Sequence, residues 1–418
     1  MKMTKYKLSE LVEVTRGASL SGQFYAEEGK LVRLTLGNFN MNGGGFKENT
    51  SKTDLFFTGT VRDEFILNEG DIITPLTEQS LGLLGTTARI PESGKYIQSQ
   101  DVALVRCKKG LLDPNFCYYL ISSSIVRQQL SAAAQQTKIR HTSPEKIKDC
   151  TVWVPDFDVQ KNIGRILTDI DNKIAINRQI NDNLEAMAKQ LYDYWFVQFD
   201  FSNEEGKPYK SSGGAMVWNE KLKREIPEGW NVANVFDELS VQYGFPFSTE
   251  LFTEDPTSIP VVRIRDILVN SVSAYSEEEV DEKYKLQKQD LLVGMDGNFH
   301  MNYWNDNVAY LNQRSVRLRA KSKSTVSIMQ AKYDIAPYIK AKELRAKGST
   351  VGHLSDKDLK ELFVLVCPNI NFRNKFDSIL AEIIENRCEM IELTKQRDEL
   401  LPLLMNGQAS VNYHLSDD

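Results

Sequence analysis

The amino-acid sequence contains two copies of one pattern, and this repeat is the feature that most restricts how the chain can fold. When Thr137–Val154 is aligned with Ser349–Val366, five positions are identical. They are His141/His353, Ser143/Ser355, Lys148/Lys360, Val152/Val364 and Val154/Val366. Most other aligned positions keep their apolar or polar character. If the flanking sequence also repeats, one structural unit is built twice.

A long helical pattern follows each copy. Apolar residues recur every three or four positions, which is the spacing of one face of an α-helix. The first stripe is Ile163, Leu167, Ile170, Ile174, Ile180, Leu184, Met187, Leu191 and Tyr194, and the second is Phe376, Leu380, Ile383, Met390, Leu393, Leu400 and Leu404. Asn177 interrupts the first stripe. Two stripes of similar length can bury each other, so we expect two long helices in an antiparallel coiled coil.

A segment rich in strand and turn signals precedes each copy. GDII (from Gly70) matches QDLL (from Gln289), and DVALVRC (from Asp101) matches SVRLRA (from Ser315). The first pair is typical of a turn followed by a strand, and the second pair of a strand in which apolar and polar residues alternate. The fold class predicted is α+β, with two tandem globular domains and a pseudo-twofold repeat. The predicted boundaries are 1–154 for the first domain, 155–205 for the central helix, 206–367 for a polar linker and the second domain, and 368–418 for the C-terminal helix and tail.

The composition is that of a folded chain with more than one domain. It has 418 residues, of which 41% are hydrophobic and 26% are charged. No apolar run approaches a membrane span and the first residues lack the apolar core of a signal peptide, so we expect a cytoplasmic location. The five cysteines show no CxxC pairing, which favours reduced thiols and argues against a zinc site.

Catalytic motifs are missing from the sequence. There is no GxxxxGK[ST] phosphate loop, no GxGxxG in a strand–turn–helix context, no GxSxG and no HExxH. The four histidines are too scattered for a histidine-rich metal site. This pattern favours a recognition protein over an enzyme.

One local stretch is strongly basic although the net charge is −6. Residues 311–347 contain ten basic side chains and two acidic ones. Such a stretch can attract phosphate, but it can equally be a solvated helix face.

The repeated motif itself has two interpretations. Ser143 is expected to cap a short helix. In the first interpretation Lys138, Arg140 and His141 lie near phosphate at this helix N-terminus, with Ser349 and Thr350 as neutral donors in the second copy. In the second, which we favour for the histidines, His141 and His353 brace the junction between domain and helix.

The segment 295–307 is a second candidate site. Its amides (Asn298 and Asn302), His300 and the rings of Tyr303 and Trp304 could read adenine edges or stack on bases. The alternative is an aromatic loop packed on its own domain. The counterpart in the first copy contains Glu78 and Gln79 instead, as expected of two modules that read different sequences.

Several motifs together resemble the specificity (S) subunit of type I restriction–modification systems. They are QTKIRHTSPEKIK (Gln136–Lys148), the segment NLEAMAKQLYDYWFVQFDF (Asn183–Phe201), IPEGW (Ile226–Trp230) and RDELLPLLMNGQ (Arg397–Gln408). The resemblance covers essentially the whole chain. GSTVGHLS replaces the more basic TKIRHTS in the second copy, which leaves phosphate contact by its individual side chains open.

The resemblance implies a subunit without catalytic activity. Each recognition domain would read one half of a bipartite double-stranded DNA site, and the helices would set the spacing. The implied partners are two methyltransferase (M) subunits that bind S-adenosylmethionine and methylate adenine, and endonuclease/translocase (R) subunits. No cofactor is expected in this chain. The alternative function is a stand-alone DNA methyltransferase or nuclease with a diverged catalytic site.

The predicted site residues fall into two groups. The DNA-binding residues predicted are Arg16, Ser19, Arg33, Asn38, Glu78, Gln79, Arg89, Lys138, Arg140, His141, Tyr243, Arg263, Arg265, Asn298, His300, Asn302, Tyr303, Trp304, Arg314, Lys347, Ser349 and Thr350. The residues predicted to bind a partner subunit are Leu191, Tyr194, Trp195, Phe196, Leu400 and Leu404, because such an apolar helix end is unfavourable in water.

Overall fold

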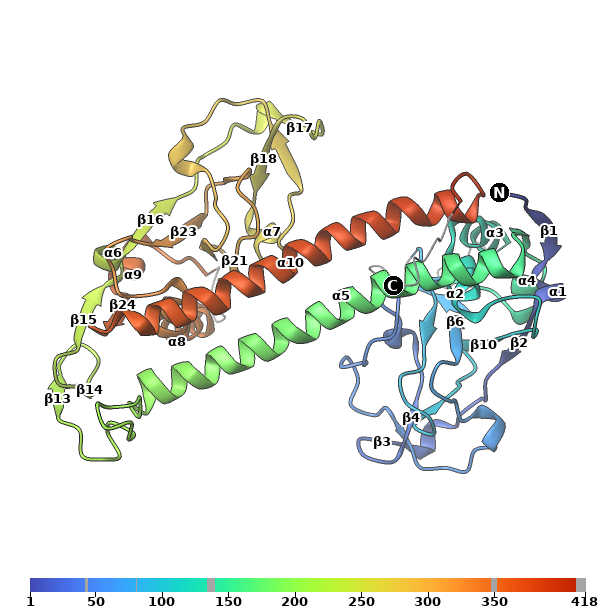
Figure 1. Ribbon diagram of the computed structural model, residues 1–418, viewed down its shortest axis with the longest axis horizontal. Coiled ribbons are helices and arrows are strands. Elements are labelled where there is room, and N and C mark those ends of the chain that lie inside the picture. Colours follow the sequence, from blue (N-terminus) through green and yellow to red (C-terminus); the bar gives the residue numbers. More distant parts are fainter. Residues whose placement is uncertain (42–43, 80, 134–139, 347–351, 411–418) are drawn as a thin grey trace, which may run out of the picture. The chain divides into compact units, whose positions relative to one another are not determined.

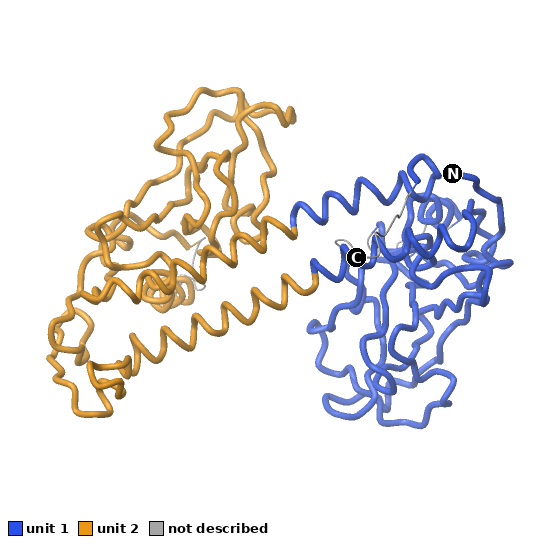
Figure 2. Tube along the Cα trace, viewed as in Figure 1, with its two compact units in different colours: residues 1–174, 391–418 blue, residues 175–390 orange. Residues whose placement is uncertain are grey.

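The computed structural model describes residues 1–41, 44–79, 81–133, 140–346 and 352–410. The chain divides into two compact units, residues 1–174 with 391–418 and residues 175–390 (Figure 2). The helices α5 (Phe157–Tyr192) and α10 (Ile370–Met405) each contribute one part to each unit (Figure 1). Both predicted long helices are therefore confirmed, and each has 36 residues.

The first unit contains twelve strands in its described residues. They are β1 (Thr4–Lys7), β2 (Val12–Arg16), β3 (Tyr25–Ala26), β4 (Leu31–Arg33), β5 (Phe56–Phe57), β6 (Ile72–Pro75), β7 (Thr77–Glu78), β8 (Ala88–Arg89), β9 (Tyr96–Ile97), β10 (Val102–Cys107), β11 (Arg140–His141) and β12 (Thr151–Val154). Its shorter helices are α1 (Leu8–Leu11), α2 (Pro114–Ser122), α3 (Ser124–Ala133) and α4 (Pro144–Lys148).

The second unit is built in the same order. Its strands are β13 (Met216–Asn219), β14 (Arg224–Pro227), β15 (Asn231–Asn234), β16 (Leu239–Tyr243), β17 (Phe252–Thr253), β18 (Ile259–Val262), β19 (Ala274–Ser276), β20 (Leu291–Gly294), β21 (Met301–Tyr303), β22 (Tyr310–Leu311), β23 (Ser315–Ala320) and β24 (Phe363–Val366). Its shorter helices are α6 (Val235–Glu238), α7 (Ile264–Val269), α8 (Ile328–Ala346) and α9 (Asp356–Lys360).

The sheet topology confirms the duplication. The first unit has a sheet of order β2-β10-β6-β8, and the second has β16-β23-β20-β21. A second sheet has the order β3-β5-β4-β9 in one unit and β17-β19-β18-β22 in the other, with one parallel pair in each, β4 with β9 and β18 with β22. The strand pair β1-β12 corresponds to β15-β24. The equivalent strands β6 and β20 therefore begin within GDII and QDLL. Their equivalent neighbours β10 and β23 are formed by DVALVRC and SVRLRA.

The repeated motif forms a capped turn of helix in both units. The Ser143 hydroxyl accepts a hydrogen bond from the Lys146 amide (3.3 Å), and the Ser355 hydroxyl accepts one from the Asp358 amide (3.3 Å). These bonds satisfy an amide that would otherwise lack a partner at the start of α4 or α9. The predicted cap is confirmed.

Part of each apolar stripe of the long helices is buried in the domain core of its own unit. In the first unit Ile163, Leu167 and Leu404 belong to one core cluster with residues of β2, β10 and α2. In the second unit Phe376 and Leu380 pack with residues of β23, β24 and α8. Burial of these side chains attaches each domain to both helices.

A buried polar cluster occupies the position where the first stripe is interrupted. Asn177 is 2% exposed, and its Nδ2 donates to Glu389 Oε2 (2.6 Å). Asn181 donates to the Ile383 carbonyl (3.1 Å) and accepts from Asn386 Nδ2 (3.0 Å). These bonds pair α5 with α10 within the second unit. A buried asparagine of this kind favours one helix register, because other registers leave its amide unsatisfied.

Asp334 of α8 joins its domain to α5 through hydrogen bonds. Its carboxylate accepts from Tyr192 Oη (2.8 Å), the Leu365 amide (3.1 Å) and Gln330 Nε2 (3.1 Å). Burial nevertheless raises the pKa of Asp334 to about 6. The folded chain therefore holds this proton more tightly than the unfolded chain does.

We expect the stability of the second unit to depend on Asp334 between about pH 4 and 7. Because the folded-state pKa is raised, this group adds stability as pH falls through about 6, with a slope of at most about 1.4 kcal/mol per pH unit. Asp334→Asn should remove this component, which urea unfolding at several pH values would measure. The exposed Glu279→Gln is the control. An unchanged pH profile in Asp334→Asn would contradict the prediction.

Among the described residues, no helix combines the length and the apolar character needed to cross a membrane.

Candidate nucleic-acid interface

One backbone arrangement recurs at the same sheet end in both units, and we call it the strand-end frame. In the first unit the Leu76 amide donates to the Asp101 carbonyl (2.8 Å), and the Thr142 amide donates to the Leu76 carbonyl (2.8 Å). His141 also pairs with Thr77 between β11 and β7. The first frame therefore contains the half-buried Asp101, the exposed His141 and Thr77, which is only 5% exposed.

The second unit repeats these bonds. The Met295 amide donates to the Arg314 carbonyl (2.9 Å), and the Leu354 amide donates to the Met295 carbonyl (2.7 Å). Asp296 and His353 form the equivalent β-bridge. The second frame contains Asp296, Arg314 and His353, so these backbone hydrogen bonds are conserved between the units while two of the three side chains differ.

Side chains in the first frame bond to their own domain beside the exposed His141. Arg140 Nη1 lies 3.1 Å from Glu78 Oε1. The other Glu78 oxygen accepts from the amides of Gly82, Leu83 and Leu84 (3.1, 2.9 and 3.0 Å). Glu78 is only 2% exposed, so it orders the following turn and cannot reach a base in this structure.

The second frame contains a bridging carboxylate. Asp296 Oδ1 lies 2.5 Å from His353 Nδ1, and Asp296 Oδ2 lies 3.5 Å from Arg314 Nε. The Arg314 side chain is 60% exposed and that of His353 is 46% exposed. His353 therefore bonds to Asp296, a residue that the sequence did not single out.

The aromatic part of segment 295–307 packs on its own domain. Tyr303 and Trp304 are 2% and 1% exposed, so neither ring is available for stacking on a base in this structure. Asn302 Nδ2 donates to the carbonyls of Ile267 and Leu268 (both 3.1 Å), and its Oδ1 accepts from Arg387 (3.1 Å). The alternative interpretation, a loop packed on its own domain, is therefore the correct description of Asn302, Tyr303 and Trp304. Asn298 is exposed and His300 is half-buried.

The other residues predicted in the first domain divide by exposure. Arg33 is 7% exposed, stacks on Tyr25 (3.8 Å to the ring centroid) and pairs with Asp54 (3.1 Å). Asn38 is 2% exposed and accepts from the Thr35 amide (2.9 Å). Three further residues, Arg16, Ser19 and Gln79, are exposed, whereas Arg89 donates to Asn115 (2.8 Å) and Lys138 lies outside the described residues.

The second domain shows the same division. Arg263 donates to Ser273 (2.7 and 2.8 Å), and Tyr243 Oη donates to Asp356 Oδ1 (2.5 Å). Burial and the Asp356 carboxylate raise the pKa of Tyr243, so its hydroxyl remains a donor. Arg265 is exposed. Lys347, Ser349 and Thr350 lie outside the described residues.

Most residues predicted to bind a partner subunit are packed inside their own unit. Phe196 is 0% exposed, and its ring lies between Trp230 (5.3 Å) and Phe376 (6.0 Å). Trp195 stacks on Phe372 of α10 (4.6 Å). Leu404 is buried, Leu191 and Leu400 are half-buried, and Tyr194 is 38% exposed. The apolar end of α5 and the π-helical turn that follows it (Asp193–Val197) thus pack on α10, which shields them from water without a partner subunit.

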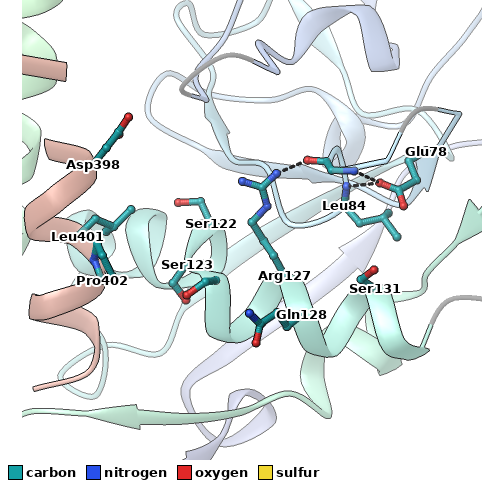
Figure 3. Close-up of a pocket in the computed structure, with 12 residues that line it drawn as sticks. Glu78, Leu84, Ser122, Ser123, Arg127, Gln128, Ser131, Asp398, Leu401 and Pro402 are labelled. Atoms are coloured by element: carbon teal, nitrogen blue, oxygen red, sulfur yellow. Dashed lines mark hydrogen bonds between the residues drawn. The ribbon is translucent and has the colours of Figure 1, made fainter. Parts of the chain in front are cut away.

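A cleft of about 610 Å³ in the first unit shows no catalytic arrangement (Figure 3). It lies between α3 and the end of α10, and its lining residues include neither His nor Cys. Ser122 and Ser123 donate their hydroxyls to backbone carbonyls (Tyr118, 3.2 Å; Leu120, 2.6 Å), so neither is activated as a nucleophile. Arg127 donates to the Gly82 carbonyl next to Glu78.

Across the described parts of the chain, no three His, Cys, Asp or Glu side chains gather closely enough to hold a metal ion.

Two domains of one topology, with one frame and different polar side chains on it, define a duplicated recognition protein.

Comparison with known proteins specifies the family. The family model for the type I restriction modification DNA specificity domain matches residues 1–186 and 227–402. The chain belongs to this family of type I restriction–modification specificity subunits.

Individual relatives of this chain are also specificity subunits. The chain is 24% identical over 318 residues to the type I restriction enzyme MjaIX specificity subunit of Methanocaldococcus jannaschii, covering 73% of this chain and 71% of that protein. It is 26% identical over 187 residues to the EcoBI specificity subunit of Escherichia coli, covering 43% and 37%. The fold is similar to that of the type I restriction–modification S subunit from M. genitalium, with a TM-score of 0.60 and 16% identity over 97% and 96% of the two chains.

Proposed function

We propose that this chain is the non-catalytic DNA-reading subunit of a cytoplasmic restriction–modification complex, and that each domain reads one half of a bipartite site. The reading domains lie within residues 1–154 and 206–367, and the helical segments are 155–205 and 368–418. The strand-end frame carries this proposal. One set of backbone bonds that carries Asp101 in one copy and Arg314 in the other, at equivalent positions, suits two readers of different sequences.

We also infer that methyl transfer and cleavage are performed by partner subunits. Two methyltransferase subunits would bring S-adenosylmethionine and methylate adenine, and endonuclease subunits would join for cleavage. Methylating a base requires flipping it out of the stack, so a reader that holds the flanking sequence is a suitable companion for the enzyme.

An exposed stripe on α5 and on the π-helical turn that follows it (Asp193–Val197) supports the docking of such a partner. Ile176, Ile180, Met187 and Tyr194 are 53%, 37%, 39% and 38% exposed and recur at intervals of four and seven residues. These side chains lie in the second unit and remain uncovered after α5 has packed on α10. A row of apolar side chains at this spacing is typical of a helix face that meets another protein.

The experiment that tests the function measures methyl transfer to duplex DNA from labelled S-adenosylmethionine. We expect no transfer by the chain alone or by the methyltransferase subunit alone, and sequence-specific transfer by both together. DNA binding by the complex should weaken as salt rises, because phosphate contacts release counterions. Transfer by the chain alone would contradict the proposal and favour a stand-alone methyltransferase. Salt-independent or absent DNA binding would favour a scaffold.

A further inference from the structure

The backbone of Arg314 is held in an unusual conformation. Its φ is +66°, in the left-handed region that non-glycine residues rarely adopt. Its carbonyl accepts from the Met295 amide (2.9 Å), and the next carbonyl, of Ser315, accepts from the Gly244 amide (3.0 Å). Conformations of this kind cost energy and persist where the surroundings hold them, often at functional sites.

The side chain of Arg314 is oriented by one contact, and its terminal nitrogens remain available to a ligand. Among the described residues one ion pair joins its Nε to Asp296 Oδ2 (3.5 Å), and the side chain is 60% exposed. Among the described residues, no hydrogen bond engages its two terminal nitrogens. Arg317 and Arg319, on the following strand, differ in this respect, because a terminal nitrogen of each donates a hydrogen bond, to Ser240 (3.0 Å) and to Asp290 (2.7 Å).

Asp296 holds Arg314 from one side through a braced carboxylate. Its other oxygen lies 2.5 Å from His353 Nδ1, and its backbone is fixed by the β-bridge to His353. A carboxylate that contacts an arginine at Nε directs the two terminal nitrogens away from itself. Those nitrogens form the planar fork that matches O6 and N7 of guanine in the major groove.

The first unit provides an internal comparison at the same place. Asp101 replaces Arg314, and Thr77 replaces Asp296, while the backbone bonds are the same. The arginine and the carboxylate that would hold it are therefore replaced together. A contact with the phosphate backbone, which is identical in both half-sites, would not require opposite charges at equivalent positions.

We propose that Arg314 is a specificity-determining residue that reads a guanine in the half-site of the second domain, and that Asp296 is its positioning residue. This inference rests on the proposed function. Asp101 in the first frame, as a carboxylate, would instead accept from the amino group of a base in the other half-site.

The test uses the full chain produced together with its methyltransferase subunit, with methylated sites mapped by sequencing the host DNA. Wild type should methylate a bipartite motif with guanine in one half. In Arg314→Ala that half should become degenerate at one guanine, whose preference over other bases falls from about 10- to 100-fold to near unity, while the other half is unchanged. If the wild-type complex methylates no bipartite site, the proposed function fails. An unchanged motif with Arg314→Ala overturns only this inference.

Two further variants separate reading from charge and folding. Arg345→Ala removes an exposed arginine of α8 and should leave every base preference unchanged. The double variant Asp296→Thr with Arg314→Asp installs the side chains of the first frame, and should replace guanine at that position by a base with an amino group. A uniform loss of methylation across all bases with Arg314→Ala, in protein of wild-type melting temperature, would identify a phosphate contact and overturn the inference.

Discussion

Exchanging the first domain of this chain for that of a relative is expected to change one half of the methylated DNA sequence and leave the other half unchanged. The reason is that each unit has its own sheets and its own core clusters. The two strand-end frames are each built within one unit, from residues 76–142 and 295–354. Mapping methylated sites in host DNA would measure the result.

The structure refines where the exchange should end. An exchange of residues 1–150 would separate β12 from its partner β1, because Thr4 pairs with Val154 and Lys7 with Thr151. Extending the exchange through Val154 keeps this strand pair together. Exchange of residues 206–367 is the reciprocal experiment and should alter the opposite half. A change in both halves from either exchange would show that the domains do not read independently.

Phe196→Ala is expected to destabilise the second unit by about 3–5 kcal/mol. Phe196 is completely buried, and its removal would leave a cavity among the rings of Tyr192, Trp230 and Phe376. These rings join the end of α5 to α10 and to the second domain. Urea unfolding followed by tryptophan fluorescence is a suitable measurement, because Trp195 and Trp230 lie in the same cluster.

Tyr194→Ala is the matched control for this prediction. Tyr194 is 38% exposed on the same turn, so its loss should change stability by less than about 1 kcal/mol. It should instead weaken association with the methyltransferase subunit if the exposed stripe of α5 is the docking surface. Wild-type stability of Phe196→Ala combined with lost partner binding would mean that Phe196 itself meets the partner.

Much of the fold could be predicted because its signals are local or repeated. The helical stripes, the Ser143 and Ser355 caps and the matched strand segments all depend on spacing within short windows. Asn177 was visible as a break in a stripe. Its partner Glu389 could not be identified from the sequence, because that contact joins residues 212 positions apart.

The candidate site was harder to predict because exposure cannot be obtained from residue type. Tyr303 and Trp304 have side chains suited to stacking on bases, but β21 and its neighbours enclose them. Arg33 and Glu78 likewise have side chains suited to nucleic acid and instead bond within their own domain. Asp101 could not have been found by aligning IQSQD with LNQRS, in which it stands opposite Ser315, because its equivalence to Arg314 follows from the backbone hydrogen bonds.

By itself, the sequence determined that the chain is a duplicated α+β protein with two long helices and a specificity-subunit pattern, because periodicity and repetition are properties of the order of residues. Only the tertiary structure decided which polar side chains meet. His141 and His353 were a matching pair in the sequence, yet their surroundings differ, since one lies opposite Thr77 and the other bonds to Asp296. Such contacts arise from strand pairing between distant segments, and no local pattern encodes them.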